Sequence, residues 1–69
     1  MNHWIETSEN ELPLNNQKVI IALNKYDMRM GIFETVDQWN RPNMFEAQGC
    51  HEATSVKYWM SAPLNPFLP

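Results

Sequence analysis

The stretch KVIIALNKYDMRMGIFETV, residues 18–36, decides the fold of this 69-residue chain. Its first part, KVIIALN at 18–24, has five successive apolar residues between turn-forming residues, which predicts a β-strand covered on both faces. The polar residues 24–27 then predict a hairpin. The second part, MRMGIFETV at 28–36, predicts a strand whose alternate residues lie on opposite faces. One face holds Met28, Met30 and Ile32, and the other holds Arg29, Gly31 and Phe33.

Further strands are predicted on the C-terminal side of this hairpin. DQWNRPN at 37–43 has the composition of a loop or hairpin tip, and MFEA at 44–47 predicts a short third strand. Residues 48–53 lack periodicity and predict a loop. TSVKYWM at 54–60 predicts the last strand. Gly31, inside the second strand, marks either a bulge or close packing under an aromatic ring.

The N-terminal segment is predicted to be irregular. Ser8 and Glu11 have the spacing of a capping box, but Pro13 ends any helix, so we expect one 3₁₀ turn. Asn15 and Asn16 tolerate left-handed dihedrals and predict a reversal of the chain. The expected fold class is therefore mainly β. It is a single small domain (1–69) with an antiparallel sheet of three to four strands, on which the N-terminal segment and the Pro-rich C-terminal tail pack.

The tail, SAPLNPFLP at 61–69, contains three prolines and cannot form a helix. An extended Pro-rich segment costs little entropy to order, so we expect it to cover the sheet beside Trp4 and Trp59. The apolar side chains of this cover are Leu64, Phe67 and Leu68. Alternatively the tail is itself a ligand for a partner domain, because its prolines have the P-x-x-P spacing.

Aromatic residues are abundant for so short a chain, with three Trp, three Phe and two Tyr. Val19 and Trp59 lie in the middle of predicted strands and are expected in the core. The remaining rings exceed what a few strands can enclose, which favours a homo-oligomer, most simply a two-fold dimer.

Two aromatic residues have an arginine nearby in the sequence and are the predicted binding residues. They are Trp39 with Arg41, and Tyr26 with Arg29. An exposed ring beside an arginine can stack on a small planar ligand or anchor a protein interface. It could also stack on single-stranded bases, but the negative net charge argues against that.

The charge of the chain is concentrated at one end. The net charge is −3, and residues 1–17 carry Glu6, Glu9 and Glu11 without a basic residue. This segment is either a solvated edge or a contact for a basic partner surface. No cluster of Lys and Arg is present, so binding to duplex nucleic acid is not expected.

Composition also indicates the compartment. No apolar run approaches the roughly 20 residues that span a bilayer, and the N-terminus lacks the basic and apolar regions of a secretory signal. Cys50 is the single cysteine, which excludes an internal disulfide and suits a reducing compartment. We therefore expect a cytoplasmic protein without membrane contact.

No catalytic group, metal site or cofactor is predicted. His3, Cys50, His51 and Glu52 are residue types that bind metals, but Cys50 and His51 are adjacent, and their side chains would diverge in a strand. The same pair lacks the orienting group that a nucleophile and its base require. With two glycines, the chain also has no Gly-rich phosphate loop.

The two ends carry a pattern of residues known from a family. The pattern is Trp4-Ile5, Leu12-Pro13, the turn at Asn15-Asn16, the strand Val19–Leu23, and Val56-x-Tyr58-Trp59-Met60-x-x-Pro63-x-x-Pro66. It resembles the small phage and prophage proteins grouped as domain of unknown function family 551. The chain differs from that family in having Tyr58 where the family usually has His, and Ser61-Ala62 in place of a Pro-Leu pair. The resemblance implies a phage or prophage origin and a β-rich fold, and it implies no chemistry.

Two functional hypotheses follow. The first is a non-enzymatic phage-type binding protein that engages a host protein or sequesters a small ligand, as an accessory against host defence would. The second is a structural or accessory domain that associates with itself and has no separate ligand.

Overall fold

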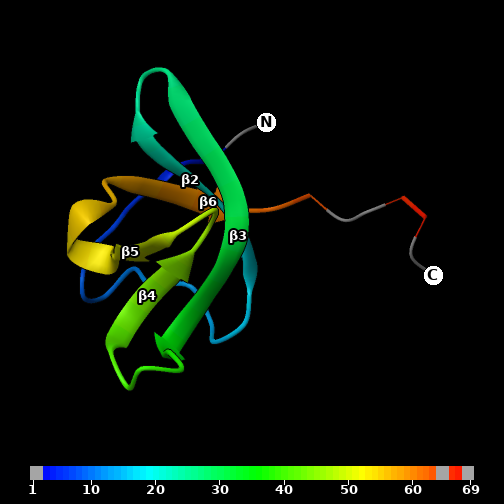
Figure 1. The fold of residues 1–69 in the computed structure, drawn as a ribbon. Coiled ribbons are helices and arrows are strands. Elements are labelled where there is room, and N and C mark those ends of the chain that lie inside the picture. Colours follow the sequence, from blue (N-terminus) through cyan, green and yellow to red (C-terminus); the bar gives the residue numbers. More distant parts are fainter. Residues whose placement is uncertain (1–2, 64–65, 68–69) are drawn as a thin grey trace.

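The computed structural model describes residues 3–63 and 66–67. Within these residues one antiparallel sheet of six strands forms, in the order β1-β6-β2-β3-β4-β5 (Figure 1). The strands are β1 (Ile5–Glu6), β2 (Lys18–Asn24), β3 (Asp27–Val36), β4 (Pro42–Glu46), β5 (Cys50–Glu52) and β6 (Tyr58–Ser61), and a 3₁₀ helix, η1 (Ala53–Ser55), precedes β6. The predicted mainly β, antiparallel fold is confirmed, although three to four strands is an undercount.

The two strands that sequence analysis missed are the short edge strands. β1 pairs Ile5 with Trp59 of β6, and β5 pairs His51 with Phe45 of β4. Segments of two or three residues have no measurable period, and they become strands because a longer strand lies beside them. The loop predicted at 48–53 therefore contains β5, and the last strand begins at Tyr58 because η1 occupies the residues before Val56.

The register of the hairpin places the core on one face of the sheet. β2 pairs with β3 so that Val19 lies opposite Gly31 and Ile21 opposite Arg29. This face, called the core face below, carries the buried residues Val19, Ile21, Phe33, Phe45, Ala47 and Trp59, with Val56 packed against them. The rings of Phe33 and Phe45 meet edge to face, 5.0 Å between centroids. The prediction that Val19 and Trp59 belong to the core is confirmed.

The N-terminal segment covers the core face and is held there by Trp59. The indole Nε1 of Trp59 donates a hydrogen bond to the carbonyl oxygen of Glu11 at 2.8 Å. One turn forms before it, with Glu11 N–H donating to the Ser8 carbonyl at 3.1 Å, but it closes a β-bridge and is not a 3₁₀ turn. Asn16 has φ of 65°, as the predicted reversal requires, and the Asn15 carboxamide accepts the amide of Thr35 at 2.9 Å.

Gly31 allows the turn after β4 to lie against β3. A methyl group on Gly31 would lie 2.6 Å from the Ala47 Cβ and closer still to the Glu46 carbonyl oxygen. Of the two alternatives predicted for this glycine, close packing is therefore correct, but the neighbour is backbone and a small side chain and not an aromatic ring. The close approach brings β4 and β5 over the core face.

Among the described residues, the opposite face of the sheet has no covering layer, which corrects the prediction that β2 is buried on both sides. The apolar part of this face, called the open face below, consists of the side chains of Ile20, Ala22, Met28, Met30, Ile32, Tyr58 and Met60. Ile20 and Ala22 are half-buried by their neighbours, whereas Met28 and Met30 are 65% and 59% exposed. The N-terminal segment packs on the core face, and residues 3–63 and 66–67 form no second layer over the open face.

The predicted C-terminal cover is wrong for the residue that can be checked. Phe67 is 93% exposed, and Figure 1 shows residues 62–63 leading away from the sheet after β6. Leu64 and Leu68 lie outside the described residues. The N-terminal segment already covers the core face through Leu12, so the apolar contact that was expected to attract Phe67 is made by a different part of the chain.

Candidate functional site

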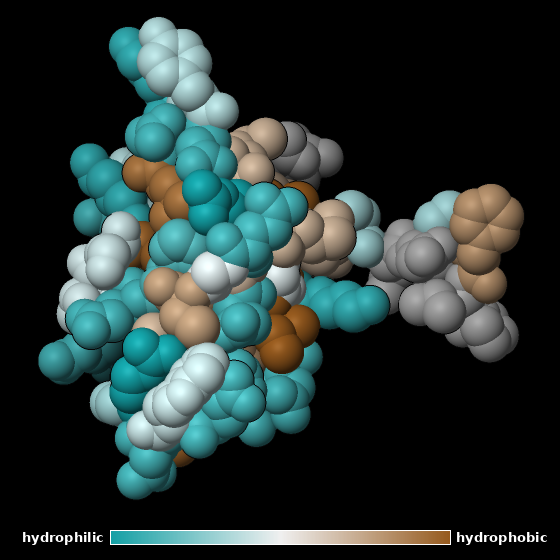
Figure 2. All heavy atoms as spheres, viewed as in Figure 1, coloured by the Kyte–Doolittle hydropathy of each residue, from teal (hydrophilic) through white to brown (hydrophobic). Residues whose placement is uncertain are grey.

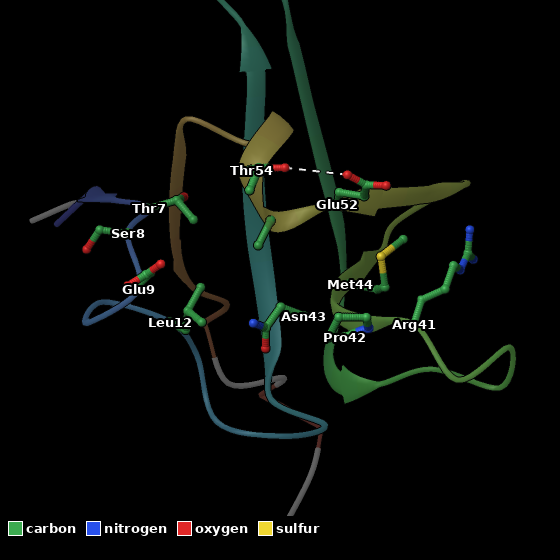
Figure 3. Close-up of a pocket in the computed structure, with 11 residues that line it drawn as sticks. Thr7, Ser8, Glu9, Leu12, Arg41, Pro42, Asn43, Met44, Glu52 and Thr54 are labelled. Carbon is green, nitrogen blue, oxygen red and sulfur yellow. Dashed lines mark hydrogen bonds between the residues drawn. The ribbon is translucent and has the colours of Figure 1, made fainter.

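A cavity of about 510 Å³ lies between the N-terminal segment and the β4–β5–η1 part of the sheet (Figure 3). This volume is in the range of about 300–1,000 Å³ that is typical of small-molecule sites. Its walls are formed by Thr7, Ser8, Glu9 and Leu12 on one side, and by Arg41, Pro42, Asn43, Met44, Glu52, Ala53 and Thr54 on the other. The two walls are more than 25 residues apart in the sequence, so they meet only because the sheet folds over its own core face.

The cavity combines an apolar surface with two carboxylates. Figure 3 shows Glu9 and Leu12 facing Asn43 across the space between the walls, with Thr54 and Glu52 above them. The ion pairs in the described part of the chain join Arg29 to Asp27 and Arg41 to Asp37. Glu9 and Glu52 are therefore without a basic partner among the described residues, and the lining carries unneutralised negative charge.

Arg41 lines the cavity but is already held by Asp37. The Nε–H of its guanidinium donates a hydrogen bond to Asp37 Oδ2 at 2.8 Å. Its Nη2 forms an ion pair with the same oxygen at 2.7 Å. In Figure 3 the guanidinium points away from the wall formed by Glu9 and Leu12. The positive charge of Arg41 is thus neutralised locally and does not offset the carboxylates of the cavity.

The Asp37 carboxylate also holds the β3–β4 turn together. It is buried, and its Oδ1 accepts the backbone amides of Trp39 at 3.0 Å and Arg41 at 2.8 Å. Burial alone would raise the pKa of Asp37, but the hydrogen bonds from Arg41 and Trp39 outweigh it, so the pKa is lowered. The same ion pair raises the pKa of Arg41. This turn is a rigid support for the residues at its tip.

Trp39 and Arg41 are brought together as the sequence predicted. The Arg41 guanidinium carbon lies 4.9 Å from the centroid of the Trp39 ring, within the range of a cation–π contact. Trp39 remains 59% exposed. The pair forms an aromatic projection at the turn that borders the cavity.

The predicted pairing of Tyr26 with Arg29 is wrong. Tyr26 is 88% exposed at the β2–β3 turn, and the cation over its ring is Lys25, at 5.3 Å. Arg29 lies on the core face, where it donates to both Asp27 oxygens at 3.1 and 3.2 Å and to the Gln48 carbonyl at 3.1 Å. A residue within the strand alternates away from a ring at the hairpin tip, and spacing along the sequence alone does not show this.

The two predicted aromatic sites do not form one surface. Tyr26 lies at the β2–β3 turn and Trp39 at the β3–β4 turn, which are at opposite ends of the long strand β3 (Figure 1). Sequence analysis did not identify the cavity residues Leu12, Asn43 and Met44. The one available signal was the concentration of acidic residues at 1–17, which includes Glu9.

The residues around Cys50 lie next to Arg41 of the cavity lining. The Cys50 Sγ donates to Glu46 Oε2 at 3.0 Å, and this hydrogen bond, together with burial, raises the pKa of the thiol against the opposing effect of Arg41. The neighbouring His51 has its Nε2 3.5 Å from Arg29 Nη1. Across residues 3–63 and 66–67, no group of three or more His, Cys, Asp and Glu side chains is arranged to hold a metal ion.

No family model matches the chain, and neither a curated protein nor a solved structure matches it. The resemblance to phage and prophage proteins therefore stays a prediction. In the described part of the chain, no helix has the length and apolar character needed to cross a membrane.

Proposed function

We propose that this chain is a non-enzymatic binding protein whose cavity accepts a cationic group on an apolar stem. The observation that carries the proposal is the lining of the 510 Å³ cavity, where Glu9 and Glu52 have no basic partner among the described residues and Arg41 is neutralised by Asp37. A lysine or arginine side chain has this chemistry, and so does a small organic amine.

The two parts of such a ligand fit different parts of the cavity. Leu12 and Ala53, which are half-buried, provide an apolar surface for the methylene stem, which long basic side chains commonly bury. Glu9 lies on the wall that faces Asn43, so its carboxylate can pair with the charged head. The other glutamates of residues 1–17 add negative potential on the same side of the cavity.

One ion pair at an exposed carboxylate contributes only about 0.2–1 kcal/mol. A protein partner would therefore need additional contacts, and the exposed Trp39 ring, which stacks on Arg41 of the lining, offers one of them. If the chain is of phage or prophage origin, as the resemblance implies, this partner is a host protein. Cys50 supports a binding role over a catalytic one, because its raised pKa leaves little thiolate at neutral pH.

The proposal is tested by NMR titration of the ¹⁵N-labelled chain with Nα-acetyl-lysine amide and with its uncharged analogue, Nα-acetyl-norleucine amide. We expect saturable shifts at the amides of Leu12, Asn43 and Ala53 with the lysine compound only. A lysine-containing pentapeptide and n-butylamine, titrated in parallel, distinguish a protein side chain from a free amine as the preferred source of the cation.

Two matched variants locate the charge that matters. Glu9→Gln should weaken binding about threefold to fivefold, the change expected for losing about 0.6–1 kcal/mol. Glu11→Gln removes the same charge two residues away, outside the cavity lining, and should change binding by less than about twofold. Equal binding of the norleucine compound, or equal loss in both variants, would overturn the proposal.

A further inference from the structure

We propose that the open face of the sheet is a two-fold symmetric interface between two copies of this chain. This inference does not rest on the cavity, whose lining shares no residue with the open face. The open face is apolar across three adjacent strands. Ile20 on β2 lies between Met30 on β3 and Met60 on β6, and Ala22 lies between Met28 and Tyr58.

The exposed area of this face is of the size that proteins use for association. With Met28 and Met30 at 65% and 59% exposure and the Tyr58 and Trp4 rings also exposed, it presents on the order of 400 Å² of apolar surface. Figure 2 shows tan and brown side chains among teal ones on the side of the molecule that carries this face. Methionine and aromatic residues are enriched in interfaces, and methionine adapts its shape to the opposing surface.

The face is shaped to fit a copy of itself. A hollow of about 300 Å³ lies at one end of it, lined by Trp4, Ala22, Met28 and Tyr58 together with Asn24 and Lys25. The exposed side chain of Met30 stands on the same face, one pleat along β3 from Met28. A two-fold interface requires a projection and a recess on one surface, because each copy supplies both.

The sequence of β2 also indicates a second cover. Five successive apolar residues at 19–23 are typical of a strand buried on both faces, and the described residues of one chain cover only the core face. A packed second copy would bury Ile20 and complete this pattern. The β2 pattern thus favours an apolar cover, and it gives no reason for a polar or charged partner.

Charges at the border of the open face are of both signs. In the row Lys18–Ile32–Glu46, a lysine and a glutamate flank the isoleucine on opposite sides. Lys25 lines the hollow, and Glu6 pairs with Tyr58 at the β1 edge. Two copies therefore bring a mixed border together and do not repel one another, whereas a strongly basic or acidic partner would meet like charges.

The area also sets the expected strength of the dimer. Two faces of this size bury roughly 1,000 Å² in total when Ile20, Ile32 and Met60 are included, which is near the lower limit for specific interfaces. We therefore expect reversible association in the micromolar range. Sedimentation equilibrium between about 5 and 500 μM should show the 8.1 kDa chain passing to twice that mass.

Met30→Lys should weaken this association at least about tenfold, since it places a charge at the centre of the apolar face. Leu14→Lys is the matched control, because Leu14 is an exposed apolar residue outside the open face. It introduces the same charge and should leave the dissociation constant within about twofold. An 8.1 kDa species throughout the concentration range, or equal weakening by both substitutions, would overturn the proposal.

A second measurement on the unchanged chain locates the interface without a substitution. With ¹³C-methyl methionine labelling, the signals of Met28, Met30 and Met60 should move as the concentration rises, whereas the buried Met44 should not. Movement at Met44 alone would contradict the inference. Glu9→Gln should leave the concentration dependence unchanged, so that failure of the cavity proposal and failure of the dimer are distinguishable.

Discussion

Replacing Gly31 by alanine tests the close approach on which both the fold and the cavity depend. The added methyl carbon would lie 2.6 Å from Ala47 Cβ and 2.7 Å from Ala47 Cα, where carbon atoms normally keep about 3.5–4.0 Å apart. It would lie closer still to the Glu46 carbonyl oxygen. These are backbone and Cβ atoms that cannot rotate away, so the end of β4 has to move by about 1 Å.

The expected cost is about 2 kcal/mol. Inserting a methyl group into a packed site typically costs about 1–3 kcal/mol, and the immobile neighbours of Gly31 place it at the upper end. Restricting the unfolded chain returns about 0.4–1 kcal/mol. For a domain of this size about 2 kcal/mol corresponds to a melting temperature about 8–16 °C lower.

Thermal and urea unfolding, followed by far-UV circular dichroism, measure this change. Val36→Ile is the control, because it also adds a carbon atom to a β3 residue, but at a side chain that is 54% exposed and outside both the open face and the cavity lining, and it should shift stability by less than about 0.5 kcal/mol. Gly31→Ala combined with Ala47→Gly should recover only part of the loss, since the Glu46 carbonyl remains. A Gly31→Ala variant that melts within about 2 °C of the unchanged chain would refute the reasoning.

Four further substitutions test separate contacts. Trp59→Ala should cost about 3–5 kcal/mol in urea unfolding, because it empties the core and removes the bond to the N-terminal segment; retention of the melting temperature would show that Trp59 is not core. Phe67→Ala should leave the melting temperature within about 2 °C, since this ring is 93% exposed, and a larger drop would support the C-terminal cover. The lowered pKa of Asp37 means that its stabilisation is complete above the ordinary pKa near 4 and is lost as the pH falls through the folded value. Asp37→Asn should therefore flatten the dependence of melting temperature on pH below about 4, and an unchanged acid slope would argue against it. Glu46→Gln should lower the pKa of Cys50 and speed its alkylation by iodoacetamide at pH 7.5, whereas an unchanged rate would show that this hydrogen bond does not hold the thiol.

The central hairpin could be predicted because its determinants are local. β2 occupies residues 18–24 and β3 begins one residue before the predicted start, as the apolar run, the polar turn and the alternation indicate. Trp39 and Arg41, which the sequence suggested as neighbouring binding residues, lie in contact for the same reason, since a tight turn brings residues two apart together. A local sequence pattern is sufficient to predict structure that depends on contacts between residues close together in the chain.

The cavity and the edge strands could not be predicted, because their determinants are far apart in the sequence. β1 and β5 exist only beside β6 and β4, and the two walls of the cavity meet only where the sheet folds over its core face. This folding of the sheet depends on the close approach of Glu46 and Ala47 to Gly31. The sequence shows that a glycine is present, but it does not show which residues lie against it.

By itself the sequence determined the antiparallel β class, the position of the central hairpin and the side on which each residue of β3 lies. Only the tertiary structure decided which face receives a cover. The apolar run of β2 is compatible with burial of either face. The face that is covered is the one on which the N-terminal segment accepts the hydrogen bond from Trp59. Because that short segment covers one face, the other has no covering layer among the described residues.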